Sequence, residues 1–233
     1  MFEVELKAHV KDRLSVIKKL NEFSTFSNVV IKDDWYYHLI LRDDNGNHGS
    51  ATMQNSKLSY VTARIRREKN LSISEYDKDS LTPFEAFTKE QPLSQKIDKD
   101  SLYYLTYKRK EIRGYLPGKD VEVNDEKETT LSNPIALEEL LHDSGFIDAT
   151  IKHKDVAAWF FDTPYGKAHI ELCTVPPLGD FLEIEIMCKT NEDKITKAVQ
   201  EELLGIISKS GLQESDIEKK YYTEMLREVK KNV

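Results

Sequence analysis

The feature that most constrains the fold is a charged pattern that recurs on strand-like segments far apart in the chain. Residues 2–10, FEVELKAHV, place Glu3, Glu5 and Lys7 at alternate positions. Residues 181–189, FLEIEIMCK, do the same with Glu183 and Glu185. Because successive side chains of a β-strand point to opposite faces, each segment is predicted to have one charged face and one apolar face.

Two further segments repeat this alternation with cations. Residues 61–69 put Arg64 and Arg66 on one face, and residues 104–112 put either Lys108 and Lys110 or Tyr107 and Arg109 on one face. An open sheet would turn such faces to water, whereas a sheet closed into a barrel can gather them inside a polar tunnel. The tunnel would hold cations at its carboxylates and phosphates at its basic side chains.

Composition excludes several classes of protein. A chain of 233 residues is long enough for one domain with a proper core, and we expect a single domain over residues 1–233. The net charge of -7 argues against binding of nucleic acid by bulk electrostatics, so a phosphate site must be enclosed. Cys173 and Cys188 are too few for a disulfide framework and are expected to be reduced. No apolar run approaches the roughly 20 residues of a membrane span, which predicts a cytoplasmic protein with no membrane partner.

Helices are predicted at three places outside these strands. Residues 12–23 have apolar side chains at helical spacing after Asp12, a plausible N-cap. Residues 132–145 have Ser132 or Asn133 as a cap, Pro134 in the first turn and Gly145 at the end. From about residue 191 to 233 we expect C-terminal helices, with a second apolar stripe formed by Ile217, Tyr221, Met225 and Val229.

The remaining segments complete a barrel of about eight strands. Residues 31–41 are rich in aromatic residues and end in a turn in which Asn45-Gly46 suits a hairpin. Residues of about 68–102 form an insertion, either a disordered loop or a lid, in which Pro83 could begin one short helix. The predicted fold is α+β, a closed eight-stranded antiparallel β-barrel with helices packed outside.

These strands also carry a family resemblance. EVELK near the N-terminus, ARIR at 63–66, TYKRK at 106–110 and LGDFLEIEI at 178–186 resemble, in this order, the motifs of the CYTH superfamily of triphosphate tunnel enzymes. The similarity spans most of the chain. Two spaced E-x-E strands that flank basic strands are a more specific signal than either alone.

The resemblance implies a role for each charged strand. The expected metal ligands are Glu3, Glu5, Glu183, Glu185 and Glu171. The expected phosphate-binding residues are Lys7, Arg64, Arg66, Lys108, Lys110, Lys152 and Lys154. Lys7, Arg66 and Glu171 are the expected catalytic residues. Oxygen ligands alone point to Mg²⁺ or Mn²⁺, and bidentate arginines and lysines suit phosphate oxygens.

One position departs from the family pattern. The family usually carries an aspartate about five residues before the Leu-Gly pair, whereas here Cys173 holds that position. A thiol serves Mg²⁺ poorly. Glu171, two residues earlier on the same face, is the candidate replacement.

The family contains two reactions, and both rely on positioning and charge neutralisation. Our leading interpretation is metal-dependent hydrolysis of a triphosphate, whether inorganic, thiamine or nucleoside triphosphate. The alternative is a class IV adenylate cyclase that converts ATP to cyclic AMP and pyrophosphate. A third reading is an inactive nucleotide- or polyphosphate-binding module. The expected partner is a triphosphate-containing small molecule, bound by a monomer or homodimer.

Overall fold

The computed structural model describes the backbone of residues 2–40, 60–116, 119–190 and 192–231, and the side chains in these ranges except residues 40, 60, 61 and 108–126. The predicted Asn45-Gly46 hairpin lies outside the described residues. The strands are β1 (Phe2–Val10), β2 (Thr25–Ile40), β3 (Tyr60–Asn70), β4 (Leu102–Leu116), β5 (Lys119–Thr130), β6 (Ile147–Thr163), β7 (Gly166–Val175) and β8 (Gly179–Cys188). The helices are α1 (Arg13–Phe23), α2 (Pro134–Asp143), α3 (Asp193–Lys209) and α4 (Tyr222–Lys231).

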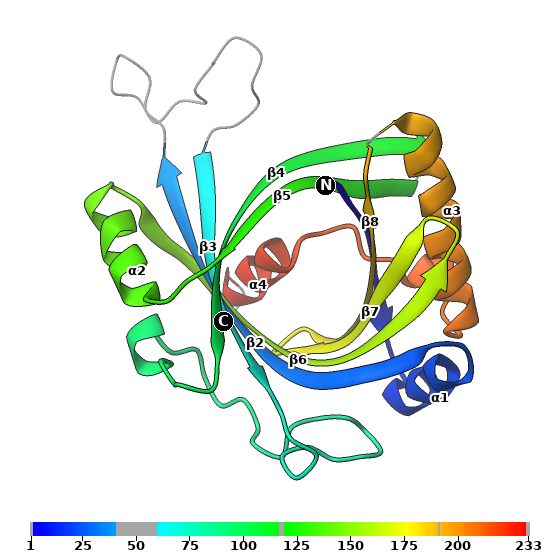
Figure 1. Ribbon diagram of the computed structural model, residues 1–233, viewed down its shortest axis with the longest axis horizontal. Helices are drawn as coiled ribbons and strands as arrows, with labels where there is room; N and C mark the ends of the chain where they lie inside the picture. Colours follow the sequence, from blue (N-terminus) through cyan, green and yellow to red (C-terminus); the bar gives the residue numbers. More distant parts are fainter. Residues whose placement is uncertain (1, 41–59, 117–118, 191, 232–233) are drawn as a thin grey trace.

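The strands form a closed antiparallel barrel in the order β1-β5-β4-β3-β2-β6-β7-β8. The first strand pairs with the last along the whole of β1, which sets Glu5 opposite Glu185. It also pairs with β5 over residues 2–5, and this shorter pairing closes the ring. Figure 1 looks through the barrel, with α1, α2 and α3 outside the strands. The predicted barrel with external helices is therefore confirmed.

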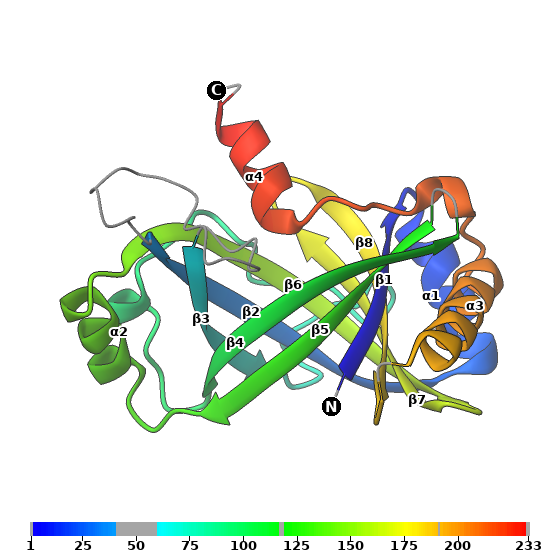
Figure 2. The same cartoon turned by 90° about the horizontal axis from the view of Figure 1, so that it is seen from above.

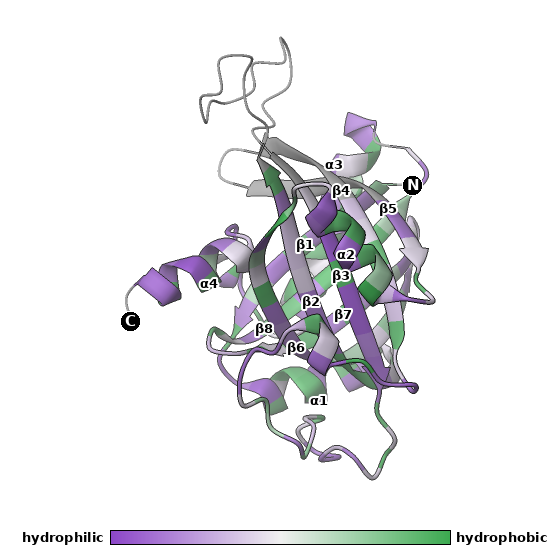
Figure 3. Ribbon diagram, turned by 90° about the vertical axis from the view of Figure 1, so that its left-hand side faces the viewer, coloured by the Kyte–Doolittle hydropathy of each residue, from purple (hydrophilic) through white to green (hydrophobic). Residues whose placement is uncertain are grey.

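The main hydrophobic core lies outside the barrel wall. Ile184 of β8 packs in one buried cluster with Leu20 of α1 and Leu203 of α3. On another side, Trp35 of β2 packs with Leu141 of α2. Hydrophilic and hydrophobic residues alternate along the strands in Figure 3. These apolar positions thus stabilise the wall from outside, while the inner face holds the charged residues together with a smaller apolar cluster that includes Val156 and Phe181.

The helix boundaries follow the predicted capping residues. The Asp12 side chain accepts a hydrogen bond of 3.0 Å from the backbone N–H of Ser15, and the Asn133 side chain accepts one of 3.1 Å from that of Ala136. Gly145 ends the α2 region at a φ of +89°, a conformation that favours glycine. Both helix predictions are confirmed.

The segment between β3 and β4 runs along the outside of the barrel. Leu93 is fully buried beside Trp35, whose indole Nε1 donates a 3.0 Å hydrogen bond to the carbonyl of Gln91. The expectation that a helix begins at Pro83 is wrong, because Pro83 forms a β-bridge with Tyr76. The short helical turn of this segment is a 3₁₀ helix at Leu93–Gln95. Burial of Leu93 against an outward-facing strand residue fixes this path.

The C-terminal chain returns to the barrel before α4 begins. Ile217 forms a bridge with Ala8 of β1, and the helix starts only at Tyr222. The predicted second stripe is therefore helical only from Tyr222 onward, because pairing with β1 extends the chain at Ile217. Figure 2 shows α4 projecting from one side of the barrel. None of the helices in the described part of the chain has the length and apolar character needed to cross a bilayer.

Candidate functional site: a charged tunnel

The barrel register brings the charged strand residues to the inner face. Lys7 lies opposite Glu183, and Glu183 in turn lies opposite Glu171. On the other side of the ring Lys32 lies opposite Lys154, and Asp34 opposite both Lys152 and Arg66. The described side chains of the inner face form two groups. The basic cluster consists of Asp34, Arg64, Arg66 and Lys152. The acidic cluster consists of Glu3, Glu5, Glu171, Glu183 and Glu185, with Lys7, Lys32 and Lys154.

The basic cluster is centred on Asp34, whose side chain is fully buried. Arg66 donates to both of its oxygens, from Nε at 2.7 Å and from Nη2 at 3.1 Å. The Lys152 ammonium lies 2.9 Å from Oδ2, and the Arg64 guanidinium 3.8 Å from it. Burial would raise the pKa of Asp34, but Arg66, Lys152 and Arg64 outweigh it and hold that pKa well below its usual range. Among the described side chains, three cations therefore share the Asp34 carboxylate, with the Glu68 carboxylate 3.7 Å from Arg66, so cations are in excess.

In the acidic cluster the described carboxylates outnumber the cations. Lys32 donates to Glu171 at 2.6 Å, and Lys154 lies 3.3 Å from the other Glu171 oxygen and also donates to Glu183. Burial would raise the pKa of Glu171, but Lys32 and Lys154 hold it well below its usual range. The His169 ring nitrogen Nδ1 lies 3.2 Å from the Glu185 oxygen Oε1. Among the described side chains five carboxylates face three lysines here, so carboxylates are in excess.

Tyr222, the first residue of α4, packs against the lysines at one end of the tunnel. Its ring centroid lies 4.5 Å from the Lys7 ammonium, 5.1 Å from that of Lys152 and 5.5 Å from that of Lys154. Lys7 also donates a 2.7 Å hydrogen bond to the carbonyl of Lys220. Cation–π contacts and this hydrogen bond thus join the C-terminal chain to predicted phosphate-binding residues.

The structure brings most of the predicted site residues into one enclosure. These are Glu3, Glu5, Lys7, Arg64, Arg66, Lys152, Lys154, Glu171, Glu183 and Glu185. Lys108 and Lys110 belong to β4, but their side chains lie outside the described residues. Placement does not test the assigned roles, which stay predictions.

Sequence reasoning missed Lys32, Asp34, His169 and Tyr222 as tunnel residues. Lys32, Asp34 and Tyr36 alternate along β2 as the glutamates do along β1, and Lys152 donates a 3.2 Å hydrogen bond to the Tyr36 hydroxyl. The aromatic content of residues 31–41 predicts a strand but does not specify which side chains line the tunnel. Trp35, on the opposite face from Lys32 and Asp34, lies in the outer core. The alternation K-x-D-x-Y was the available signal.

A second buried polar network lies outside the barrel. Arg67 pairs with Asp33 at 2.7 Å and with Asp98 at 2.6 Å, while His153 contacts Asp33 at 2.7 Å and Asp155 at 3.0 Å. Burial would lower the pKa of His153, but hydrogen bonds to Asp155 and Asp33 raise it to about 9. Because Asp98 belongs to the segment between β3 and β4, this network ties that segment to the wall.

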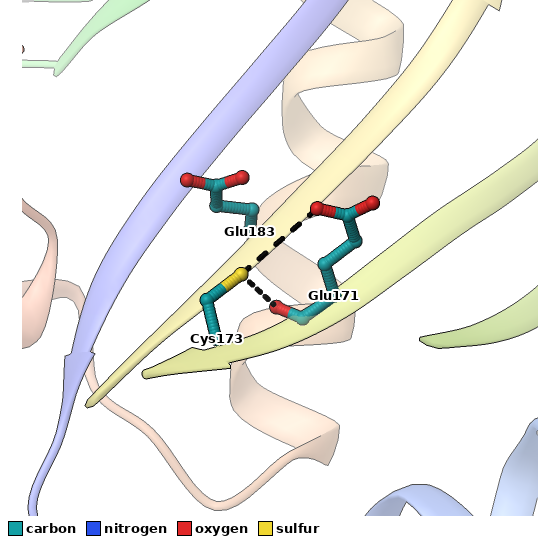
Figure 4. Close-up of side chains that lie close together, drawn as sticks. All are labelled: Glu171, Cys173 and Glu183. Atoms are coloured by element: carbon teal, nitrogen blue, oxygen red, sulfur yellow. Dashed lines mark hydrogen bonds between the residues drawn. The ribbon is translucent and has the colours of Figure 1, made fainter. Parts of the chain in front are cut away.

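The donor set of the tunnel only partly fits Mg²⁺ or Mn²⁺. The glutamates offer the oxygen ligands that these ions prefer. Cys173, however, shares the inner face of β7 with Glu171, and donor atoms of Glu171, Cys173 and Glu183 lie within 4.8 Å of one another. Figure 4 shows the three side chains together. Burial raises the pKa of the Cys173 thiol well above its usual value, and Glu183 and Glu171 reinforce the rise against Lys154.

Comparison with known proteins was made by sequence and by structure. No protein-family model and no curated protein matches the chain. The PH1819 protein from Pyrococcus horikoshii OT3 superposes with a TM-score of 0.65 at 22% identity, over 97% of this chain and 99% of that chain. An adenylate cyclase candidate from Vibrio parahaemolyticus gives 0.55 at 17%, over 97% and 98%.

A third solved structure is an adenylyl cyclase candidate from Hippeastrum that is described as having a dominant triphosphatase activity. It gives a TM-score of 0.50 at 14% identity, over 98% of this chain and 95% of that chain. Identities this low establish the fold alone. These likenesses show that the chain shares the fold of these three proteins over nearly its whole length.

Proposed function

We propose that the chain hydrolyses a linear triphosphate with the help of a divalent metal ion inside the tunnel. The observation that carries the proposal is the division of one closed inner face into a basic and an acidic cluster. A triphosphate is a compact polyanion that suits the basic cluster, and a divalent cation suits the acidic one. Inorganic triphosphate, thiamine triphosphate and nucleoside triphosphates all share this recognition chemistry.

The basic cluster would hold the phosphate oxygens. Arg66 already uses its planar fork on the two Asp34 oxygens, which is the geometry by which a guanidinium binds a phosphate. Arg64 and Lys152 add positive charge that Asp34 alone does not neutralise. Binding of phosphate would therefore satisfy the surplus charge while Asp34 keeps the arginines aligned.

The acidic cluster would hold the metal. Glu3, Glu5, Glu183 and Glu185 with Glu171 are the residues that would bind Mg²⁺ or Mn²⁺, which would neutralise phosphate charge and orient water when bound. Glu171 is a poor proton acceptor because its pKa is held well below its usual range. We therefore assign Glu171 to holding the ion, and Lys7 and Arg66 to neutralising charge on the reacting phosphate.

A class IV adenylate cyclase reaction is the second candidate. It is favoured by the Vibrio parahaemolyticus likeness, since that protein is described as an adenylate cyclase candidate with the same fold. Cyclisation also requires a site for the adenine ring. Tyr222 and Tyr36, two described rings beside the tunnel lysines, already contact ammonium groups, Tyr222 three of them and Tyr36 that of Lys152 at 5.6 Å. The hydrolase therefore stands first.

Product analysis separates these functions. The purified protein is incubated with inorganic triphosphate, thiamine triphosphate or ATP in Mg²⁺ or Mn²⁺, and orthophosphate, pyrophosphate and cyclic AMP are resolved. We expect metal-dependent release of orthophosphate, fastest from the physiological class of substrate. Cyclic AMP with equal pyrophosphate would instead assign the cyclase. Absence of any product would indicate an inactive binding module. That outcome would be supported if Cys173→Asp, which restores the aspartate of the family pattern, gained turnover.

Neighbouring arginines on opposite faces of β3 provide a matched pair of variants. Arg66→Lys keeps a charge beside Asp34 but loses the bidentate fork, so turnover should fall about a hundredfold. Arg67→Lys changes the outer network and should leave turnover within about twofold, as expected for a residue that touches no substrate. Equal losses in the two variants would contradict a phosphate-binding role for Arg66.

Glu5→Gln tests the carboxylate end of the same site. The change keeps the size of the side chain and removes one charge opposite Glu185. It should abolish most turnover while the melting temperature stays close to that of the wild type. Unfolding of this variant would indicate that Glu5 serves structural ion pairing instead.

A further inference from the structure

A thiol faces the tunnel between two carboxylates. Glu171 and Cys173 are two residues apart on β7, and Glu183 lies opposite Glu171 on β8. Donor atoms of the three residues lie within 4.8 Å of one another, and Figure 4 shows Glu171, Cys173 and Glu183 around a common space. The Cys173 thiol donates to the Glu171 carbonyl at 3.7 Å and lies 3.9 Å from its carboxylate. Two kinds of ligand atom therefore converge in one place.

The surroundings of the three residues are apolar on one side and suit a positive charge on the other. Cys173 is fully buried in a hydrophobic cluster with Val156 and Phe181, whereas Glu171, 7% exposed, accepts a 2.6 Å hydrogen bond from Lys32. The Lys154 ammonium donates to carboxylates of both Glu171 and Glu183. It therefore occupies, in this structure, a position suited to a cation. A divalent ion that entered would displace this ammonium toward the phosphate-binding side of the tunnel.

The ligand types decide which cation suits the group. Mg²⁺ prefers oxygen ligands alone, whereas thiolate combined with carboxylate or imidazole suits zinc and related ions. Metal–sulfur bonds of about 2.3 Å and metal–oxygen bonds of about 2.0–2.2 Å bring donor atoms to about 3.5 Å apart in a tetrahedral site. The donor atoms, now up to 4.8 Å apart, would thus move closer together when the ion binds. Rotation of the two glutamate side chains can bring them together.

We propose that Glu171, Cys173 and Glu183 form a binding site for a divalent transition-metal ion of the zinc, cobalt and cadmium class. Cys173 binds as the thiolate, and its proton passes to solvent as the metal–sulfur bond forms. The two carboxylates supply oxygen ligands, and water or a substrate oxygen completes the coordination. The site shares Glu171 and Glu183 with the Mg²⁺ or Mn²⁺ site of the proposed function and in that respect rests on it, but its ion selectivity can be measured whether or not the chain turns over a triphosphate.

The chain contains its own control thiol. Cys188 is also buried and free, but it belongs to the outer core cluster, and its thiol contacts the carbonyl of Ile186 at 3.8 Å. A spectroscopic signal from a thiolate–metal bond should therefore depend on Cys173 and be indifferent to Cys188.

The test is a titration of the full-length, metal-free protein with Co²⁺ and with Cd²⁺ in a reducing agent that contains no thiol. We expect a near-ultraviolet charge-transfer band that saturates at one ion per chain, persists in Cys188→Ala and disappears in Cys173→Ser. In a competition titration, Cys173→Ser should bind Zn²⁺ at least about tenfold more weakly than the wild type. A loss of about tenfold is the smallest that is usual even when the changed residue only supports a metal ligand. Cys173→Asp should bind Mn²⁺ without the band.

Two results would overturn the proposal. One is absence of the band in the wild type while Mg²⁺ or Mn²⁺ binds equally to wild type and Cys173→Ser, which would make Lys154 the permanent cation of the group. The other is a band that survives Cys173→Ser. Failure of the proposed function is distinguishable, because it would appear as a band without release of orthophosphate.

Discussion

The basic and acidic clusters share one inner face and differ in which charge is in excess. In the basic cluster Arg64, Arg66 and Lys152 surround the single carboxylate of Asp34. In the acidic cluster, carboxylates from β1, β7 and β8 outnumber the lysines, and Lys154 alone contacts two of them. Asp34, Arg64 and Lys152 are buried, and so are Glu3, Glu171 and Lys154, whereas the Glu185 side chain is 36% exposed, so water screens the acidic cluster more at that residue. Each surplus therefore favours a ligand of the opposite charge.

This contrast explains why the sheet is built with charged residues inward. Buried ion pairs of this kind offer little net stability, since the cost of desolvation offsets much of the attraction. Stability comes from the outer wall, where Ile184 and Leu203 pack between strand and helix. The charged inner face is thus free to serve binding, and its two surpluses would hold a polyanion and a metal ion side by side.

The largest expected effect comes from removing the one carboxylate of the basic cluster. Asp34→Asn removes the carboxylate that Arg66 and Lys152 share, leaving Arg66 only the longer 3.7 Å contact with Glu68, and should lower the free energy of unfolding by about 4 kcal/mol. Inorganic triphosphate should restore much of it, because the variant binds the anion more tightly. Urea denaturation with and without triphosphate measures both effects.

The matched control for that experiment is Asp33→Asn, one residue away on the outer face. Loss of the Asp33 carboxylate breaks contacts with Arg67 and His153, so it should also destabilise the protein. Triphosphate should not restore this loss. Equal restoration of both variants would show that the anion binds outside the basic cluster.

The corresponding change in the acidic cluster is Lys154→Met. It leaves Glu171 and Glu183 facing each other without the shared ammonium and should lower the free energy of unfolding by about 3 kcal/mol. Mn²⁺ should restore stability to this variant and have little effect on Asp34→Asn. Thermal melting in a series of Mn²⁺ concentrations checks it, and the comparison fails if Mn²⁺ stabilises both variants alike.

The outer network predicts a pH dependence of stability that depends on His153. The folded pKa of His153 is raised to about 9, above its unfolded value of 6.5, so its contribution is fully present below pH 6.5 and is lost as pH rises through 9. The expected loss is about 3 kcal/mol. Urea denaturation between pH 6 and 10 should show this decline in wild type and a flatter profile in His153→Gln. Parallel profiles would contradict the assignment.

The smallest effect is expected on the surface of α1. Lys19 and Glu22 form an exposed pair at 3.1 Å, and Glu22→Gln should change the free energy of unfolding by less than about 0.5 kcal/mol. A small change here, beside the large changes expected in the tunnel, would show that ion pairs in the tunnel affect the free energy of unfolding because they are buried. A loss above 1 kcal/mol, measured by urea denaturation, would weaken that interpretation.

Local alternation predicted much of this architecture. Glu3, Glu5 and Lys7 share a face because side chains alternate along any strand, and the same rule placed Glu183 and Glu185. Side-chain chemistry identified Asp12 as one helix cap and left Ser132 or Asn133 as the other, of which Asn133 is the cap in the structure. Closure of the barrel then set the two acidic strands side by side, as predicted.

Contacts that depend on the three-dimensional path were beyond local rules. Lys32 and Glu171 are joined across 139 residues, and no periodicity specifies that pair. The bridge between Ile217 and Ala8 overrode a helical apolar stripe, because pairing with an existing strand replaced helical hydrogen bonds. Tyr222 likewise reaches the tunnel lysines only because this bridge directs the chain back across the barrel.

The most direct test of the two-cluster account is a crystal structure with Mn²⁺ and a non-hydrolysable triphosphate analogue. The account predicts an anomalous Mn²⁺ peak among Glu171, Glu183 and Glu185, with phosphate oxygens bonded to Arg64, Arg66 and Lys152. Phosphates bound outside the barrel, or a metal ion away from these glutamates, would contradict it.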